Sequence, residues 1–225
     1  MKKKRKGCFA AAGFMMIFVF VIASFLLVLL FFNRDLVKKL PIDTKTIVLE
    51  RLTDYKPLVE EELESQGLSN YTSLILGMMY QESKGKGNDP MQSSESLGLK
   101  RNEITDPQLS VKQGIKQFTL MYKTGKEKGV DLDTIIQSYN MGAGYIDFVA
   151  EHGGTHTEEL AKQYSEQQVK KNPDLYTCGG NAKNFRYPYC YGDYTYAEKV
   201  KEKTKTVEES LQVATLETME SKAHE

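Results

Sequence analysis

Two carboxylic acids near the middle of the chain could do chemistry: Glu82 and Asp89, in the stretch "MMYQESKGKGNDPMQ" at 78–92. Ile75, Met78 and Glu82 are three and four residues apart, which places them on one helix face. The first two are apolar, so this face should point into the core. A carboxyl group in an apolar setting keeps its proton to higher pH. The pattern makes Glu82 a candidate general acid; the alternative is a glutamate in a last helical turn that reaches into water.

Asp89 is the candidate for a second carboxylate. It follows a loop with Gly85 and Gly87 and precedes Pro90, so its backbone should be held in a defined turn. One protonated and one ionised carboxyl group are the usual equipment for cleaving a glycosidic bond. Glu95 is a rival for this role, and its alternative is a solvated loop glutamate. The spacing leaves inversion and retention of the sugar configuration both open.

Other catalytic patterns are missing from the sequence. His152 and His156 are four residues apart but have two glycines and no glutamate between them, which does not fit a metalloprotease helix. There is no C-x-x-C pair, no G-x-S-x-G and no phosphate-cradling glycine loop. Neither Cys178 nor Cys190 has a helix start beside it that would activate a thiolate. We therefore expect no metal and no cofactor.

The charge distribution argues against nucleic acid as a partner. The chain has 225 residues with 30 basic and 30 acidic side chains, and five of the basic ones lie within residues 1–6. Removing those five leaves 25 basic against 30 acidic residues, so the rest of the chain is net negative. A phosphate backbone needs a basic face. The length favours one globular domain with accessory segments.

A membrane anchor is expected near the N-terminus. Residues 8–32 contain no charged side chain, and a helix of that length exceeds the roughly 30 Å hydrocarbon core. The alternative is a cleaved secretory signal, but its apolar region would be about 7–15 residues long and end in a small-residue site. Cys8 follows Gly7 and the lysines, which does not fit a lipoprotein signal. We expect 1–6 in the cytoplasm, 7–32 across the cell membrane, and the remainder outside, facing the cell wall.

Helical patterns dominate the chain after a linker at 33–45. Apolar residues recur at helical spacing in several stretches, and no convincing period-two strand appears. Pro57 marks an expected helix start, and Ser110 opens a capping-box pattern. We predict an all-α, compact domain at 46–203, followed by a polar, frayed or disordered tail at 204–225.

The stretch 174–200 has a different composition, with many tyrosines, glycines and asparagines. Tyrosine offers a flat apolar face and a hydroxyl, which suits sugar rings and the edge of a core alike. Cys178 and Cys190 form an even pair on the expected outer side, where an oxidising environment permits a disulfide. Two free thiols are the alternative.

Five short motifs in order resemble the lysozyme-like superfamily that includes goose-type lysozymes and soluble lytic transglycosylases. They are "QES" with its glycine loop, "MQSSESLG", "DPQLSVKQGI", "QSYNMGAG" and "YAEKV". Within that superfamily, "QESKGKGNDPMQSSES" is most similar to the muramidase domain of Gram-positive cell-wall hydrolases, often carried by conjugative elements. The resemblance covers about residues 46–203 and implies a goose-type or SLT-like helical fold.

The resemblance also implies roles for individual positions. Glu82 corresponds to the catalytic acid, and Asp89 to the second acid of the muramidase subgroup. Core packing is the alternative for Tyr139. The residues expected to contact the substrate are Ser83, Gln92, Ser94, Glu95, Tyr139, Asn140 and Tyr191.

The expected function is a membrane-tethered muramidase that cleaves the β-1,4 bond between N-acetylmuramic acid and N-acetylglucosamine in peptidoglycan. Local opening of the wall for growth, or for a secretion or conjugation complex, would suit the tether. "NDPMQ" replaces the G-L-M-Q of transglycosylases, which favours hydrolysis. The alternatives are a lytic transglycosylase and a non-catalytic peptidoglycan-binding or assembly module. The peptidase domain that follows in many relatives is not expected, because the chain ends soon after "YAEKV".

Overall fold

The computed structural model describes residue 22 and residues 44–223. The chain divides into two units, Met1–Thr44 and Lys45–Glu225, and the second holds nearly all of the described residues. The expected anchor at 7–32 lies outside them, apart from residue 22. None of the helices that the structure describes combines the length and the apolar character of a membrane span.

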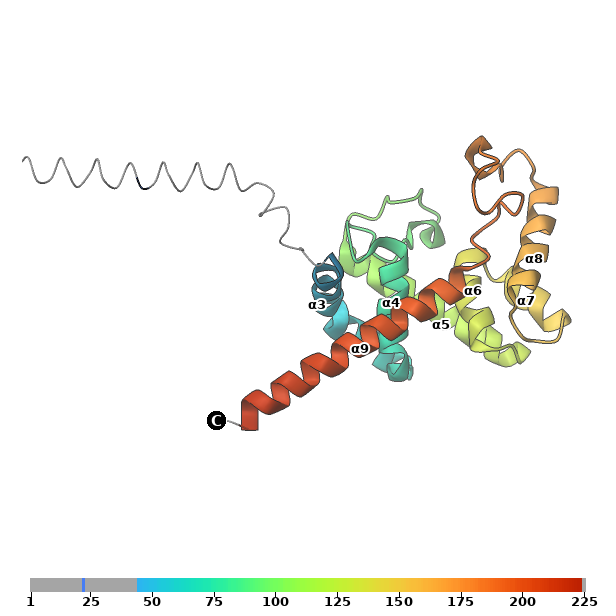
Figure 1. The fold of residues 1–225 in the computed structure, drawn as a ribbon. Helices are drawn as coiled ribbons and strands as arrows, with labels where there is room; N and C mark the ends of the chain where they lie inside the picture. The colour runs from blue at the N-terminus through green and yellow to red at the C-terminus, as the bar shows by residue number, and fades with distance from the viewer. Residues whose placement is uncertain (1–21, 23–43, 224–225) are drawn as a thin grey trace, which may run out of the picture. The chain divides into compact units, whose positions relative to one another are not determined.

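The second unit is built from helices, and residues 44–223 contain no strand. The all-α prediction is thus confirmed for this part of the chain. In chain order the elements are α3 (Thr44–Ser65), η1 (Ser69–Tyr71), α4 (Thr72–Ser83), η2 (Ser94–Leu97), α5 (Pro107–Lys128), α6 (Leu132–Met141), α7 (Gly144–Glu151), α8 (Glu158–Lys171), η3 (Cys178–Gly180) and α9 (Tyr196–Ala223) (Figure 1).

Helix α4 lies at the centre of the core. Every residue from Leu74 through Met79 is buried. Helix α9 packs along α4 and also contacts α6 (Figure 1). Gly77 permits this close approach, because a Cβ there would lie 2.8 Å from the Cα of Thr204. The last helix of the chain is therefore pressed against the helix that carries Glu82.

The end of α4 is fixed by its own sequence and by α3. Lys84 and Gly85 have φ angles of 60° and 66°, in the left-handed region that stops a helix. Arg51 on α3 donates from Nη1 to the carbonyl oxygen of Lys84 at 2.8 Å. The turn that follows Glu82 and Ser83 is thus held in place from outside.

Two expected helix starts are wrong. Pro57 lies inside α3, which begins at Thr44; buried side chains on both sides of the proline keep α3 a single helix against the local preference. Ser110 lies inside α5, whose N-cap is Asp106. The Asp106 side chain accepts from the backbone N–H of Gln108, and a proline occupies the first helical position, so this start prevails over the capping-box pattern.

The polar tail expected from residue 204 is instead part of α9, which continues through Ala223. Val207 is buried, at 2% exposure, so packing on the core extends past the expected boundary. Polar composition alone predicts fraying, whereas two apolar side chains, Val207 and Leu211, pack this stretch against the core.

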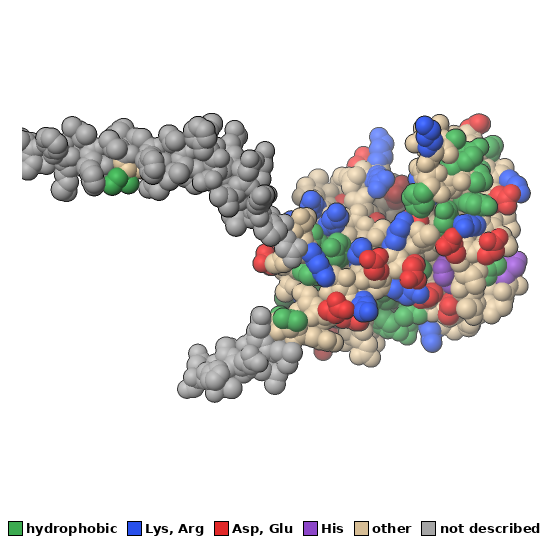
Figure 2. All heavy atoms as spheres, in the orientation of Figure 1, with side chains coloured by type: hydrophobic (Ala, Val, Ile, Leu, Met, Phe, Trp, Pro, Cys, Tyr) green, Lys and Arg blue, Asp and Glu red, His purple; other side chains and the backbone are tan. Residues whose placement is uncertain are grey.

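Little regular structure occurs between α8 and α9. Cys178 and Cys190 form a disulfide with a Cα–Cα distance of 4.9 Å. Three large apolar side chains of this segment are exposed: Leu175, Phe185 and Tyr187. Figure 2 shows hydrophobic side chains gathered at the upper right of the folded unit, whereas acidic and basic side chains mix over the rest of that face.

Candidate active site

Glu82 lies in the last turn of α4 and is partly buried. Ile75 and Met78, on the same helix face, are fully buried, as their spacing predicted. Tyr196, the first residue of α9, donates its hydroxyl to Oε1 of Glu82 at 2.6 Å. The tyrosine is only 2% exposed, so this contact is shielded from water.

The surroundings of Glu82 keep a proton on its carboxyl group. Burial raises the pKa of Glu82 from 4.5 to about 7, and the negative charge of Asp89 adds to this rise. The hydrogen bond from Tyr196 and the charge of Arg101 act in the opposite direction but do not cancel it. The group is therefore close to half protonated at neutral pH, the state that suits a general acid.

The surroundings of Asp89 shift its pKa in the opposite direction, downward. Asp89 is 3% exposed, and each oxygen accepts a hydrogen bond from a backbone N–H and another from a serine hydroxyl. Oδ1 accepts from Ser93 N at 2.9 Å and Ser110 Oγ at 2.7 Å, and Oδ2 from Ser94 N at 3.2 Å and Ser94 Oγ at 2.6 Å. Burial alone would raise the pKa of Asp89, but these hydrogen bonds together lower it. Asp89 is a buried, ionised carboxylate whose lone pairs are occupied.

The loop that carries Asp89 is held on both sides. Ser83 donates from Oγ to the carbonyl oxygen of Pro90 at 2.8 Å and accepts from the N–H of Lys86 at 3.1 Å. Tyr139 donates its hydroxyl to the carbonyl oxygen of Met91 at 3.0 Å, and is itself buried. Both Ser83 and Tyr139, expected to contact substrate, therefore also brace the loop in this structure.

Gln92 adopts a backbone conformation that is unusual for its type. Its φ is 49°, which costs on the order of 1–3 kcal/mol and is typical of functional sites. Its Nε2 donates to Asp89 O at 3.0 Å and to Asn102 Oδ1 at 2.7 Å, and its Oε1 accepts from Arg101 Nε at 3.0 Å. Gln92 therefore fixes the position of an exposed guanidinium that acts electrostatically on Glu82.

Ser94 and Glu95 are neighbours with different surroundings. Ser94 is buried, and besides its bonds to Asp89 its hydroxyl accepts from the N–H of Ile104 at 3.1 Å. Glu95 is exposed on η2. Only Glu95 of the two presents its side chain to solvent, where a substrate could meet it.

Asn140 and Tyr191 lie where the segment before α9 meets the end of α6. Oδ1 of Asn140 accepts from the N–H of Asp193 at 2.6 Å. The hydroxyl of Tyr191 donates to the carbonyl oxygen of Met141 at 2.8 Å, and its ring is partly buried. These contacts anchor the segment that leads into Tyr196.

Three residues of the site are not identified by the sequence patterns. Tyr196 stands in "YAEKV", a motif that marks the family without suggesting a contact to the acid. Ser110 fits a helix cap by its spacing, but its hydroxyl faces Asp89. No sequence pattern indicates that Arg101 belongs to the site. No cluster of three or more His, Cys, Asp or Glu that could hold a metal ion occurs among residues 44–223.

Comparisons with known proteins find a matching family and several similar proteins. A family model described as lysozyme-like matches residues 49–204. The pneumococcal vaccine antigen A homolog of Streptococcus pyogenes serotype M1 is 39% identical over 140 residues, which are 62% of this chain and 69% of that protein. The bifunctional muramidase/DL-endopeptidase CwlT of Bacillus subtilis strain 168 is 38% identical over 117 residues, 52% of this chain and 35% of that protein.

A solved structure is also similar. The crystal structure of a protein similar to lipoprotein, NLP/P60 family, from Staphylococcus aureus subsp. aureus Mu50 matches with a TM-score of 0.59 and 34% identity. The match covers 69% of this chain and 52% of that one, so this chain spans about half of the other.

Proposed function

Because the chain belongs to the lysozyme-like family, we propose that it is a peptidoglycan hydrolase, and specifically an N-acetylmuramidase that cleaves the β-1,4 bond between N-acetylmuramic acid and N-acetylglucosamine. The observation that carries the proposal is Glu82, a partly buried carboxyl group whose pKa is raised to about 7. The similarity to a bifunctional muramidase/DL-endopeptidase supports the choice of peptidoglycan as substrate.

Glu82 is the proposed general acid. Tyr196 donates to Oε1, so Oε2 is the oxygen left to carry the proton toward the glycosidic oxygen. When the proton leaves, the carboxylate that forms keeps the Tyr196 hydrogen bond, which stabilises the ionised product state. The same contact that lowers the pKa of the resting acid thereby assists proton transfer.

Asp89 has a proposed electrostatic and positioning role. Its lone pairs are used by Ser93, Ser94 and Ser110, which leaves little capacity to attack the sugar or to activate water. Its fixed negative charge can favour the positive charge that develops on the sugar in the transition state. It also holds the loop that presents Gln92.

The proposed location is the outer face of the cell membrane, with the N-terminus in the cytoplasm and the lysozyme-like domain facing the wall. The uncharged stretch 8–32 behind a basic start supports this placement. A tether there would restrict cleavage to nearby wall, which suits local opening for growth or for a secretion or conjugation complex.

The test compares the full-length chain with Glu82→Gln on purified peptidoglycan. We expect the variant to lose a factor of about 10²–10⁴ in turnover, because that is the usual contribution of a general acid. Glu151→Gln, which removes an exposed carboxylate at the end of α7, outside the candidate active site, is the matched control and should keep most of the activity.

Two outcomes would contradict the proposal. Equal turnover of the Glu82→Gln variant and the parent chain would exclude Glu82 as the acid. Mass spectrometry of the products should find reducing N-acetylmuramic acid ends; 1,6-anhydro ends would instead identify a lytic transglycosylase.

A further inference from the structure

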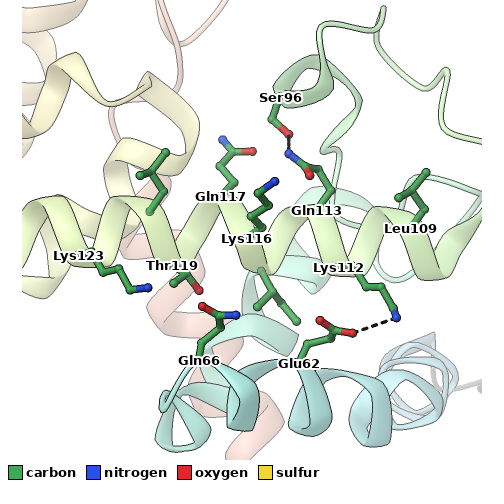
Figure 3. Close-up of a pocket in the computed structure, with 12 residues that line it drawn as sticks. Glu62, Gln66, Ser96, Leu109, Lys112, Gln113, Lys116, Gln117, Thr119 and Lys123 are labelled. Atoms are coloured by element: carbon green, nitrogen blue, oxygen red, sulfur yellow. Dashed lines mark hydrogen bonds and ion pairs between the residues drawn. The ribbon is translucent and has the colours of Figure 1, made fainter.

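A groove separate from Glu82 and Asp89 runs along α5, between the end of α3 and η2 (Figure 3). We call it the α5 groove. Its volume is about 680 Å³, within the range of pockets that bind ligands. Its lining residues are Glu62, Gln66, Ser96, Leu109, Lys112, Gln113, Ile115, Lys116, Gln117, Thr119, Leu120 and Lys123.

The α5 groove is locally basic. Lys112 forms an ion pair with Glu62 at 3.1 Å, which neutralises both. Lys116 and Lys123 also line the groove, and neither forms an ion pair with any other residue in the described part of the chain. They are two helical turns apart, about 10 Å along the axis. Two unpaired ammonium groups on a net negative body favour an extended anionic ligand.

The groove also carries groups that suit a sugar. Gln66, Gln113 and Gln117 provide amides, which hydrogen-bond to hydroxyl and N-acetyl groups. Leu109 and Leu120 are 44% and 60% exposed and offer apolar contact for the faces of sugar rings. Amides, leucines and lysines in one groove fit a glycan that bears carboxylates.

One polar group in the groove lacks a partner. Thr119 is 4% exposed, and its Oγ1 has no hydrogen-bond partner among the described residues. An unsatisfied buried hydroxyl normally costs about 1–3 kcal/mol. In Figure 3 Thr119 lies on the side of α5 that faces Gln66.

The α5 groove adjoins the loop of the candidate active site. Ser96, on its rim, accepts from Gln113 Nε2 at 3.0 Å and donates to the carbonyl oxygen of Ser93 at 2.6 Å. Ser93 in turn donates its N–H to Asp89. A ligand in the groove would therefore lie next to the element that supports Asp89.

We propose that the α5 groove is a second peptidoglycan-binding site, which holds a glycan strand through its sugar hydroxyls and places the carboxylates of its lactyl groups or stem peptides on Lys116 and Lys123. The inference rests on the proposed function for its choice of ligand. The site would keep the protein on the wall between cleavage events, while Glu82 acts on another stretch of glycan.

The test measures co-sedimentation with insoluble peptidoglycan. The full-length chain carries Glu82→Gln throughout, so that the wall is not digested during the measurement. Lys116→Gln/Lys123→Gln is compared with Lys126→Gln/Lys171→Gln, which removes the same charge from exposed lysines that do not line the groove. We expect binding to weaken roughly three- to tenfold in the groove variant only. Added salt should reduce the difference between the two variants.

A second measurement separates this inference from the proposed function. With Glu82 intact, the groove variant should cleave a soluble N-acetylmuramic acid–N-acetylglucosamine tetrasaccharide at the parent rate. Equal sedimentation of the groove and control variants would overturn the inference whether or not the chain is a hydrolase. The chain could also sediment with a crude wall preparation but not with wall from which acidic proteins have been removed. That result would assign the groove to an acidic protein partner, and it would overturn the inference as well.

Discussion

Glu82 and Tyr196 form a donor–acceptor pair in which the tyrosine stabilises the ionised carboxylate. The contact is 2.6 Å long, and without it burial would raise the pKa of Glu82 further. The pair therefore sets the pH above which the acid loses its proton. It also gives a way to test the assignment of the acid without removing the carboxyl group.

Tyr196→Phe should move the high-pH limit of kcat upward. The hydrogen bond from Tyr196 lowers the pKa of Glu82, so its loss lets the pKa rise by about one pH unit. The pH–rate profile measures this directly. Tyr139→Phe is the matched control, because that hydroxyl donates to Met91 O and not to the acid. A downward shift in Tyr196→Phe, or equal shifts in both variants, would contradict the assignment.

Glu82→Gln should stabilise the fold at high pH. The pKa of the carboxyl group is about 7 in the folded chain against 4.5 when unperturbed, so the unfolded chain ionises first as pH rises. The free energy of unfolding therefore falls between about pH 4.5 and 7, by on the order of 3 kcal/mol, and the penalty is complete above 7. The neutral amide of the variant carries no such penalty. Urea unfolding at pH 5 and pH 8 measures the difference; a variant less stable than the parent at pH 8 would contradict the burial argument.

The loop between α4 and α5 acts as a unit organised around Asp89. Ser110, from α5, donates to Asp89 and accepts from the N–H of Met91 at 3.0 Å. One hydroxyl thus joins the helix, the carboxylate and the loop backbone. All of these groups are buried, so each depends on the others for its hydrogen bonds.

Ser110→Ala should destabilise the chain by about 1–3 kcal/mol, because it leaves the buried Met91 N–H without an acceptor. The pKa of Asp89 should rise, since the hydrogen bond from Ser110 helps to lower it, and activity should then fall off at a higher pH on the acidic side. Chemical unfolding and the pH–rate profile measure the two effects. Ser96→Ala removes a hydroxyl from η2 that does not bond to Asp89. This variant should shift neither the acidic nor the basic side of the pH–rate profile.

The sequence predicted elements and faces better than it predicted contacts. Periodicity placed Glu82 on the buried face of α4, because that information is local. Ser110 matched a capping box, but Asp106 and the following proline form a stronger start four residues earlier. Tyr196 could not be paired with Glu82, because 114 residues separate them and no local pattern encodes the contact.

At the scale of the whole molecule, the segment between α8 and α9 contains the disulfide and leads into Tyr196, the residue that contacts Glu82. Tyr191 and Asp193 attach it to the end of α6, and Gln137 accepts from the N–H of Ala197 at 2.9 Å, next to Tyr196. The position of the tyrosine that contacts Glu82 therefore depends on how this segment is held.

Cys178→Ala/Cys190→Ala should lower the free energy of unfolding by roughly 2–3 kcal/mol, because the disulfide closes a loop with a sequence separation of 12. Dithiothreitol should lower the melting temperature of the parent chain and leave that of the double variant unchanged. Equal melting temperatures of the parent and the double variant, without reductant, would show that the covalent bond adds nothing.

The contact between α4 and α9 has a consequence for biosynthesis. Glu82 emerges from the ribosome long before Tyr196, and Gly77 has no Thr204 to pack against until α9 has been made. A nascent chain that ends before α9 holds the acid without its tyrosine and with one side of α4 uncovered. If the chain is the proposed muramidase, its activity should therefore appear only late in the synthesis of the folded unit, once α9 has been made.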